Sequence, residues 1–188
     1  MTVLKRIPKV LSPRLLHVLA SMGHGDEIVL ADANFPAASI ASHTPGGLVN
    51  SDGAVSSDCV SRYGQLLYIQ VHFHHSFYIL APTFPKGNDI PTLLTAIMQL
   101  LPLDETAPPA IVMEMMPAHQ ALGWKTQIWD TYKEIVSEGE GRNVALTTVE
   151  RFEFYARSKQ AYAVIATGET ALYGNLILKK GVIGSTGE

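Results

Sequence analysis

The sequence predicts an α/β fold, a single three-layer domain in which a central sheet is flanked by helices. Two observations predict it. Short apolar runs that suit buried strands alternate with longer segments whose apolar residues recur at helical spacing. No linker-like stretch divides the 188 residues, of which 47% are hydrophobic. One domain with one core is therefore expected over residues 1–188.

The first expected elements are a helix and a buried strand. Ser12 suits an N-cap, Pro13 suits the first helical position, and Gly23 suits the end of the helix. The apolar run 27–31 then predicts a short strand, and a polar loop follows from Asp32. Ligands of layered α/β folds often lie beyond the carboxyl ends of strands, so this loop is a candidate binding position.

The same alternation resumes in the second half of the chain. Asp89 suits the N-cap of the first helix there, and Gly139 and Gly141 suit the end of the second. Within 43–89, residues 43–47 and Asn50-Ser51-Asp52-Gly53 are turn-forming, and the aromatic, partly β-branched run 63–80 predicts one or two strands. The expected elements of the second half are helices at 90–101, 126–136 and 150–159, and strands at 110–116, 144–149, 161–167 and 175–180.

Composition excludes several classes of partner. The net charge is -3 and no block of like charges occurs, so neither nucleic acid nor an acidic membrane surface is expected to bind. The run 66–82 is too short and too polar to span a membrane. Cys59 is the single cysteine, which favours a reducing compartment, and no signal-peptide pattern follows the N-terminus. A cytoplasmic protein is therefore expected.

A histidine between two glycines is the most informative local feature. Gly23 and Gly25 allow unusual backbone angles and close approach of a ligand to His24. Histidine titrates near neutral pH, so it can both donate and accept a proton. Asp32 is a candidate to bind sugar hydroxyls or to orient His24. The structural alternatives are a solvated turn for His24 and a self-capped loop for Asp32.

Two later segments carry hydrogen-bonding groups suited to a neutral polyol. Arg151 and Tyr155 share a face at helical spacing, and Tyr173-Gly174-Asn175 precedes the last expected strand. Sugar sites combine several such groups with a partly apolar pocket. The alternatives are an amphipathic helix with one buried aromatic edge for the first segment and an ordinary β-turn for the second.

Metal and cofactor chemistry is not expected. His72 and His74 would share a face of a strand, but no framed ligand spacing accompanies them. No dinucleotide, phosphate-loop, serine-hydrolase or C-x-x-C motif is present. Nothing near Cys59 in the sequence would activate it as a nucleophile.

Taken together, these segments resemble the RbsD/FucU mutarotase family, in particular its fucose branch. The resemblance covers residues 11–36, 90–104 and 150–181, and MGHGDEI, RFEFY and YGNLILKKG are jointly specific. It implies an RbsD-like α/β fold and a metal-free, cofactor-free aldose mutarotase. It also implies homo-oligomers, from dimers to decameric rings, with sites near subunit contacts. By the resemblance, His24 is the catalytic histidine and the sugar-site positions are Asp32, Asp104, Arg151, Tyr155, Tyr173, Gly174 and Asn175.

The chain departs from the family pattern in one segment. Some three dozen extra residues stand between Asp52-Gly53 and Ile90-Pro91, and they include Cys59 and three of the seven histidines. We expect 54–89 to be an insertion from an alternative exon or gene model. If it is part of the protein, it should form a surface excursion that disturbs oligomer contacts.

The expected function is therefore an isomerase that interconverts the α and β anomers of L-fucose by opening and closing the sugar ring. His24 would be the main proton donor, Asp32 would orient it or the substrate, and Tyr155 or Tyr173 would handle the second proton. Three alternatives stay open. They are a sugar-binding module without turnover, a mutarotase acting on ribose, and a metal-dependent hydrolase using His24, His72, His74 and Asp32.

Overall fold

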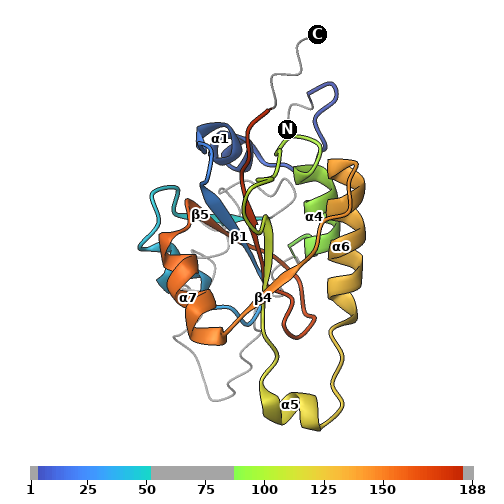
Figure 1. Ribbon diagram of the computed structural model, residues 1–188. Helices are drawn as coiled ribbons and strands as arrows, with labels where there is room; N and C mark the ends of the chain where they lie inside the picture. Colours follow the sequence, from blue (N-terminus) through green and yellow to red (C-terminus); the bar gives the residue numbers. More distant parts are fainter. Residues whose placement is uncertain (1–3, 52–86, 184–188) are drawn as a thin grey trace, which may run out of the picture.

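A computed structural model describes residues 4–51 and 87–183. Its centre is a six-stranded sheet with the order β2-β5-β1-β6-β3-β4 (Figure 1). The strands are β1 (Glu27–Ala31), β2 (Leu48–Asn50), β3 (Ala110–Met113), β4 (Thr147–Val149), β5 (Ala163–Ala166) and β6 (Leu176–Lys179). The helices are α1 (Pro13–Ser21), α2 (Ala37–Ala41), α4 (Ile90–Ile97), α5 (Pro117–Ala121), α6 (Gln127–Glu140) and α7 (Arg151–Gln160).

Alternating strand residues feed two cores, one on each face of the sheet. Ile28 and Leu30 of β1 face a core with the apolar sides of α1, α4 and α6. Val29 and Ala31 face a second core with α2, α7 and the fully buried Phe154. A strand whose side chains are buried on both faces requires a helical layer on each side. The predicted three-layer α/β architecture is confirmed.

One strand runs against the other five. β1 pairs parallel with β5 and antiparallel with β6, and β6 is also antiparallel to β3. β2 and β4 follow the direction of β5 and β3. The carboxyl ends of five strands therefore meet the amino end of β6 at one edge of the sheet. This edge gathers the loops after β1, β3 and β4 with the loop before β6.

The predicted helix starts are confirmed at two N-caps. Ser12 accepts a hydrogen bond from the backbone N–H of Leu15, and Asp89 accepts one from that of Thr92. Each caps a helix whose first residues include a proline. These caps fix where α1 and α4 begin.

The predicted end of this helix is confirmed at Gly141 and wrong at Gly139. α6 continues through Gly139 to Glu140, and Gly141 ends it with a left-handed φ of 64°. A Cβ at Gly139 would lie 2.7 Å from the Cβ of Met98, so the glycine permits close packing of α6 against the end of α4. It is a packing glycine and not a stop.

Three short elements were not predicted, and several strands are shorter than expected. α2, β2 and α5 have no counterpart in the prediction, and Asn50 belongs to β2 although it was assigned to a turn. β3 ends at Met113, so residues 114–116 form part of the loop that leads into α5. The possible strands at 63–80 lie outside the described residues.

Candidate functional site

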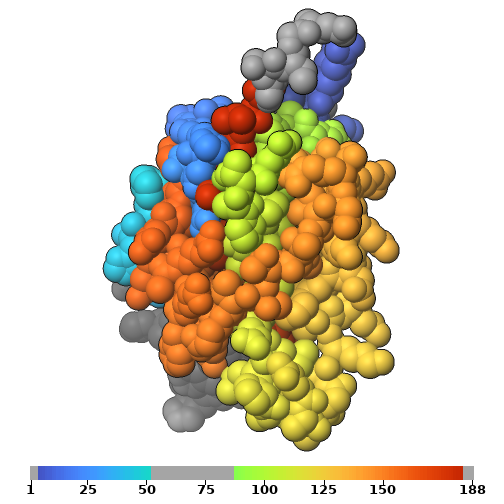
Figure 2. All heavy atoms as spheres, in the orientation of Figure 1, coloured from blue at the N-terminus to red at the C-terminus, as the bar shows by residue number. Residues whose placement is uncertain are grey.

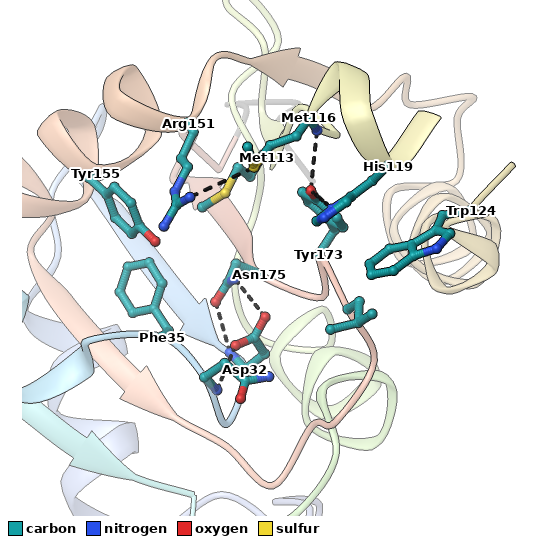
Figure 3. A pocket seen from close by; sticks show the side chains of 12 residues that line it. Asp32, Phe35, Met113, Met116, His119, Trp124, Arg151, Tyr155, Tyr173 and Asn175 are labelled. Carbon is teal, nitrogen blue, oxygen red and sulfur yellow. Dashed lines mark hydrogen bonds between the residues drawn. The ribbon is translucent and has the colours of Figure 1, made fainter. Parts of the chain in front are cut away.

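A pocket opens at the edge of the sheet where five strands end (Figure 3). Its volume of about 280 Å³ is close to the lower limit of the roughly 300–1,000 Å³ typical of small-ligand sites, which suits a single sugar ring. The pocket brings together five of the predicted site residues, namely Asp32, Arg151, Tyr155, Tyr173 and Asn175.

Asp32 and Asn175 form a reciprocal pair at the base of the pocket. The Asn175 side-chain amide donates to Asp32 Oδ2 at 2.7 Å, and the Asp32 backbone N–H donates to Asn175 Oδ1 at 2.9 Å. The backbone N–H of Asn34 donates to Asp32 Oδ1 at 2.9 Å. Burial raises the pKa of Asp32, and these hydrogen bonds partly offset the increase. Asp32 is thus a fixed acceptor whose remaining lone pairs are available to a ligand.

The loop before β6 is held in an unusual conformation. Tyr173 has a φ of 60°, a region that residues other than glycine rarely occupy. Two side chains of α6 bind this loop, because Trp129 donates to the Tyr173 carbonyl at 2.9 Å and Tyr132 donates to the Gly174 carbonyl at 2.7 Å. Strained backbone that is held by several contacts is typical of functional sites.

Gly174 allows the close packing beneath this loop. A Cβ there would lie 2.9 Å from the Ala171 carbonyl oxygen and 3.6 Å from the Cβ of Asp32. The missing side chain therefore lets the Ala171 carbonyl and the Glu169 side chain pack against Gly174, whereas the distance to Asp32 is ordinary van der Waals contact.

The opposite wall combines a cation with aromatic surface. The guanidinium of Arg151 lies 5.6 Å from the ring centroid of Tyr155, which in turn lies 5.6 Å from that of Phe35. Both α7 residues face the cavity, as their spacing of four predicts (Figure 3). This wall offers hydrogen-bond donors beside an apolar ring face.

Sequence reasoning missed three pocket residues from the segment after β3, namely Met116, His119 and Trp124. His119 Nδ1 lies 2.6 Å from the hydroxyl oxygen of Tyr173, and the His119 ring stacks on Trp124 with 4.0 Å between centroids. The available signal was their position shortly after a buried strand, the same signal that identified Asp32. Figure 2 shows the α5 region and the β4–α7 segment side by side on the surface at this end of the molecule.

His24 and Asp104 lie at the opposite edge of the sheet. His24 precedes β1, Asp32 follows it, and the five-residue strand spans roughly 16 Å at about 3.3 Å per residue. Within one subunit Asp32 therefore cannot orient His24, and that interpretation is wrong for a single chain. Asp104 is the carboxylate near His24, with Oδ2 3.6 Å from His24 Nε2 and 3.2 Å from Lys179 Nζ.

The electrostatics of this second cluster favour a permanently ionised carboxylate. Hydrogen bonds from the backbone and hydroxyl of Thr106 are the main cause that holds the pKa of Asp104 well below its usual range, and Lys179 adds to it. The side chain of His24 is 56% exposed, so it is accessible from outside the subunit.

Residues 4–51 and 87–183 were the part of the chain in which a metal site and a membrane-spanning helix could be sought, and they contain neither. That part of the chain holds no group of three histidine, cysteine or acidic side chains that would bind a metal ion. No helix there is long and apolar enough to cross a bilayer. His72, His74 and Cys59 lie outside the described residues.

The chain matches the model of the RbsD / FucU transport protein family over residues 5–76 and 79–183. Fucose mutarotase of Danio rerio is 44% identical over 183 residues, which is 97% of this chain and 96% of that protein. Fucose mutarotase of Mus musculus is 45% identical over 184 residues, 97% of each chain. The crystal structure of the fucose mutarotase of Streptococcus pneumoniae in complex with L-fucose has a TM-score of 0.69 and 37% identity, covering 96% of this chain and 100% of that one.

Proposed function

Because the chain belongs to the RbsD/FucU family, we propose that it is an L-fucose mutarotase, an isomerase that interconverts the α and β anomers of the sugar. Similarity to fucose mutarotases extends over nearly the full length of the chain. The observation that carries the proposal is the pocket itself. One side supplies the fixed acceptors Asp32 and Asn175, and the other supplies Arg151, Tyr155 and the aromatic ring of Phe35.

This arrangement suits a neutral deoxy sugar. Ring hydroxyls need several donors and acceptors held in fixed positions, and Asp32 and Asn175 hold each other in place. The apolar faces of Met113, Phe35 and Trp124 also line the cavity and offer a surface for C–H groups and for the methyl group of fucose.

The reaction needs two proton transfers and no cofactor, since nothing is oxidised, hydrolysed or transferred to another molecule. A proton is added to the ring oxygen while one leaves the anomeric hydroxyl, so the ring opens to the aldehyde. Rotation about C1–C2 and reversal of the two transfers give the other anomer. His24 is the proton donor to the ring oxygen, and a tyrosine hydroxyl of the pocket takes the second proton.

The complete site is shared by two subunits of a homo-oligomer. His24 and the pocket of the same chain are separated by the length of β1, whereas the exposed position of His24 lets it enter the pocket of a neighbour. Apolar side chains near the pocket support this arrangement, because Leu122 and Phe152 are 71% and 75% exposed and a second subunit would cover them. Asp104 and Lys179 accompany His24 across the contact.

Two finer points follow from the same proposal. We expect the protein in the cytosol, where free monosaccharides are metabolised and a lone cysteine stays reduced.

We also infer that 54–89 is an insertion relative to the family. The family model matches residues 5–76 and 79–183, so its matched segments extend into 54–89 from both sides and break there at 77–78. A peptide map without any peptide from 54–89 would show that the segment is absent from the mature chain.

Saturation-transfer NMR tests the activity directly. Irradiating the α-anomer signal of L-fucose should reduce the β-anomer signal far more with protein than without it, and more than for ribose or galactose. The His24→Ala variant should fold normally and lose this exchange. Equal exchange with and without the wild-type protein would instead identify a sugar-binding module. Full exchange by the variant would remove His24 from the mechanism.

A further inference from the structure

Two apolar side chains of the pocket reach the molecular surface. Trp124 and Leu172 line the cavity, and they are 41% and 53% exposed. Met113 and Phe35 also line the cavity, but both are buried, so they lie deeper. Trp124 and Leu172 therefore form an apolar rim at the mouth of the cavity.

The apolar rim is separate from the main hydrogen-bonding groups of the pocket. Arg151 and Tyr155 stand on the side of the cavity opposite Trp124 (Figure 3). Met116 is exposed at the mouth as well, but its sulfur lies 3.8 Å from Arg151 Nη1 and so belongs to that polar side. A sugar substituent that meets the apolar rim therefore contacts mainly carbon surface.

Trp124 is held in place although it is exposed. Its ring stacks on His119 with 4.0 Å between centroids and an interplanar angle of 21°. Its backbone N–H donates to the His119 carbonyl at 3.1 Å, and His119 Nδ1 lies 2.6 Å from the Tyr173 hydroxyl oxygen. This last contact connects the rim to the loop before β6, whichever atom donates. A preorganised wall can distinguish sugar substituents without first being ordered by the ligand.

The chemistry of ring opening places one carbon of the sugar at this mouth. The ring oxygen O5 must receive its proton from His24, which is exposed and reaches the cavity from a neighbouring subunit. C5 is bonded to O5 and carries C6, so C6 lies two bonds from the atom that faces the neighbour. C3 lies across the ring from O5, and its hydroxyl therefore points toward the base of the cavity. In L-fucose, C6 is a methyl group.

We propose that Trp124 and Leu172 are specificity-determining residues that bind the C6 methyl group of L-fucose. The proposal rests on the proposed mutarotase function and narrows the preferred substrates to 6-deoxy aldoses. Contact with the apolar rim stabilises the methyl group by removing it from water. A C6 hydroxyl at the same position would give up hydrogen bonds to water against carbon surface, and a sugar without C6 would leave the rim unused.

Two sugars differ from L-fucose only at C6. D-Arabinose has the same configuration at C2, C3 and C4 and lacks C6, whereas L-galactose carries a hydroxyl on C6. We expect kcat/KM for exchange of the pyranose anomers to be about tenfold or more higher for L-fucose than for D-arabinose, because one apolar carbon in a binding pocket contributes at least that factor. L-Galactose should also be exchanged more slowly than L-fucose.

Alanine variants of the apolar rim test the proposal with D-arabinose as an internal reference. Trp124→Ala and Leu172→Ala should each lower kcat/KM for L-fucose about fivefold or more and leave kcat/KM for D-arabinose within about twofold of the wild type. A general loosening of the pocket would slow both sugars equally, so the ratio separates recognition of the methyl group from a structural role. Leu48→Ala is the matched control, because Leu48 is similarly exposed, lies on the edge strand β2 and does not line the pocket.

The outcomes that would overturn the proposal are distinct from a loss of activity. Equal losses for both sugars in the rim variants, or no loss for either, would show that the rim does not recognise the methyl group. A preference for L-fucose that disappears in Met113→Ala but persists in both rim variants would place the methyl group in the interior of the cavity. Wild-type protein that accelerates exchange of none of the three sugars would instead refute the proposed function.

A measurement without turnover keeps the inference separate from the activity. The chain has two tryptophans. In the complex of L-fucose with tryptophan-labelled protein, isotope-filtered NMR should show a nuclear Overhauser contact between the fucose methyl protons and an indole ring. Trp124→Leu should abolish this contact, and a contact that persists in the variant, or is absent from the saturated wild type, would overturn the inference. If the contact is present but the wild type does not accelerate exchange, the mutarotase function fails and the methyl site stands.

Discussion

Replacing Asn175 by alanine should destabilise the protein through the buried carboxylate at the base of the pocket. Asn175 and Asp32 are only 5% and 7% exposed. The change removes the hydrogen bond to Asp32 Oδ2, of a type that contributes about 1.5–3 kcal/mol when the partner is charged. It also leaves the Asp32 backbone N–H without its acceptor, which costs about 1–3 kcal/mol. The expected loss is about 2.5–6 kcal/mol at pH 7.

Urea unfolding followed by circular dichroism measures this loss, and thermal unfolding should show a fall in Tm on the order of 10 °C for a chain of this size. Asn34→Ala is the matched control, because Asn34 is exposed and touches Asp32 only through its backbone N–H. We expect that control to change the free energy of unfolding by less than about 0.5 kcal/mol. Equal, small losses in both variants would refute the argument that Asn175 supports an ionised Asp32.

The loss should also depend on pH. The folded-state pKa of Asp32 is above the ordinary value of 3.8, so in the window just above 3.8 the native protein binds more protons than the unfolded chain. Lowering the pH through this window therefore stabilises the fold through Asp32. Without Asn175 the pKa of Asp32 is higher still, so the variant gains more from acidification and its deficit shrinks. A deficit that grows as the pH falls would contradict this sign.

The loop before β6 gives two further predictions. Gly174→Ala should destabilise the fold by about 1–3 kcal/mol in urea unfolding, because its Cβ would lie 2.9 Å from the Ala171 carbonyl oxygen and the backbone must shift; an unchanged free energy of unfolding would show that the loop adapts freely. Tyr132→Phe should cost about 1–3 kcal/mol, since the Gly174 carbonyl loses its donor at 2.7 Å, and fucose exchange should weaken as the loop loosens. Wild-type stability in that variant would mean that another donor replaces the phenol.

The sequence predicted those parts of the fold in which a strong local pattern and tertiary packing agree. α1 and α4 carry an N-cap, a nearby proline and one apolar face, and β1 is a short apolar run. α2 and β2 have only five and three residues, too few to show a period, and they exist because they pack against the sheet. Gly139 failed as a stop because its contact with Met98 cannot be inferred from local sequence.

The candidate site divides in the same way. Asp32 and Asn175 were predicted from their positions at strand ends, and the antiparallel direction of β6 brings those two ends together. His24 precedes β1 and Asp32 follows it, so the length of that strand places His24 at the opposite edge of the sheet. The contact of His119 with Tyr173 joins residues 54 positions apart at 2.6 Å, so only the assembled fold reveals this contact.

Mixing two inactive variants tests most directly whether the site is shared between subunits. His24→Ala lacks the proton donor and Tyr155→Phe lacks the pocket phenol proposed to handle the second proton, so each homo-oligomer should exchange little fucose. After joint unfolding and reassembly at equal amounts, about one quarter of the shared sites should regain both groups, and exchange should recover to about that fraction of the wild-type rate. No recovery from mixed oligomers that demonstrably contain both variants would contradict the account.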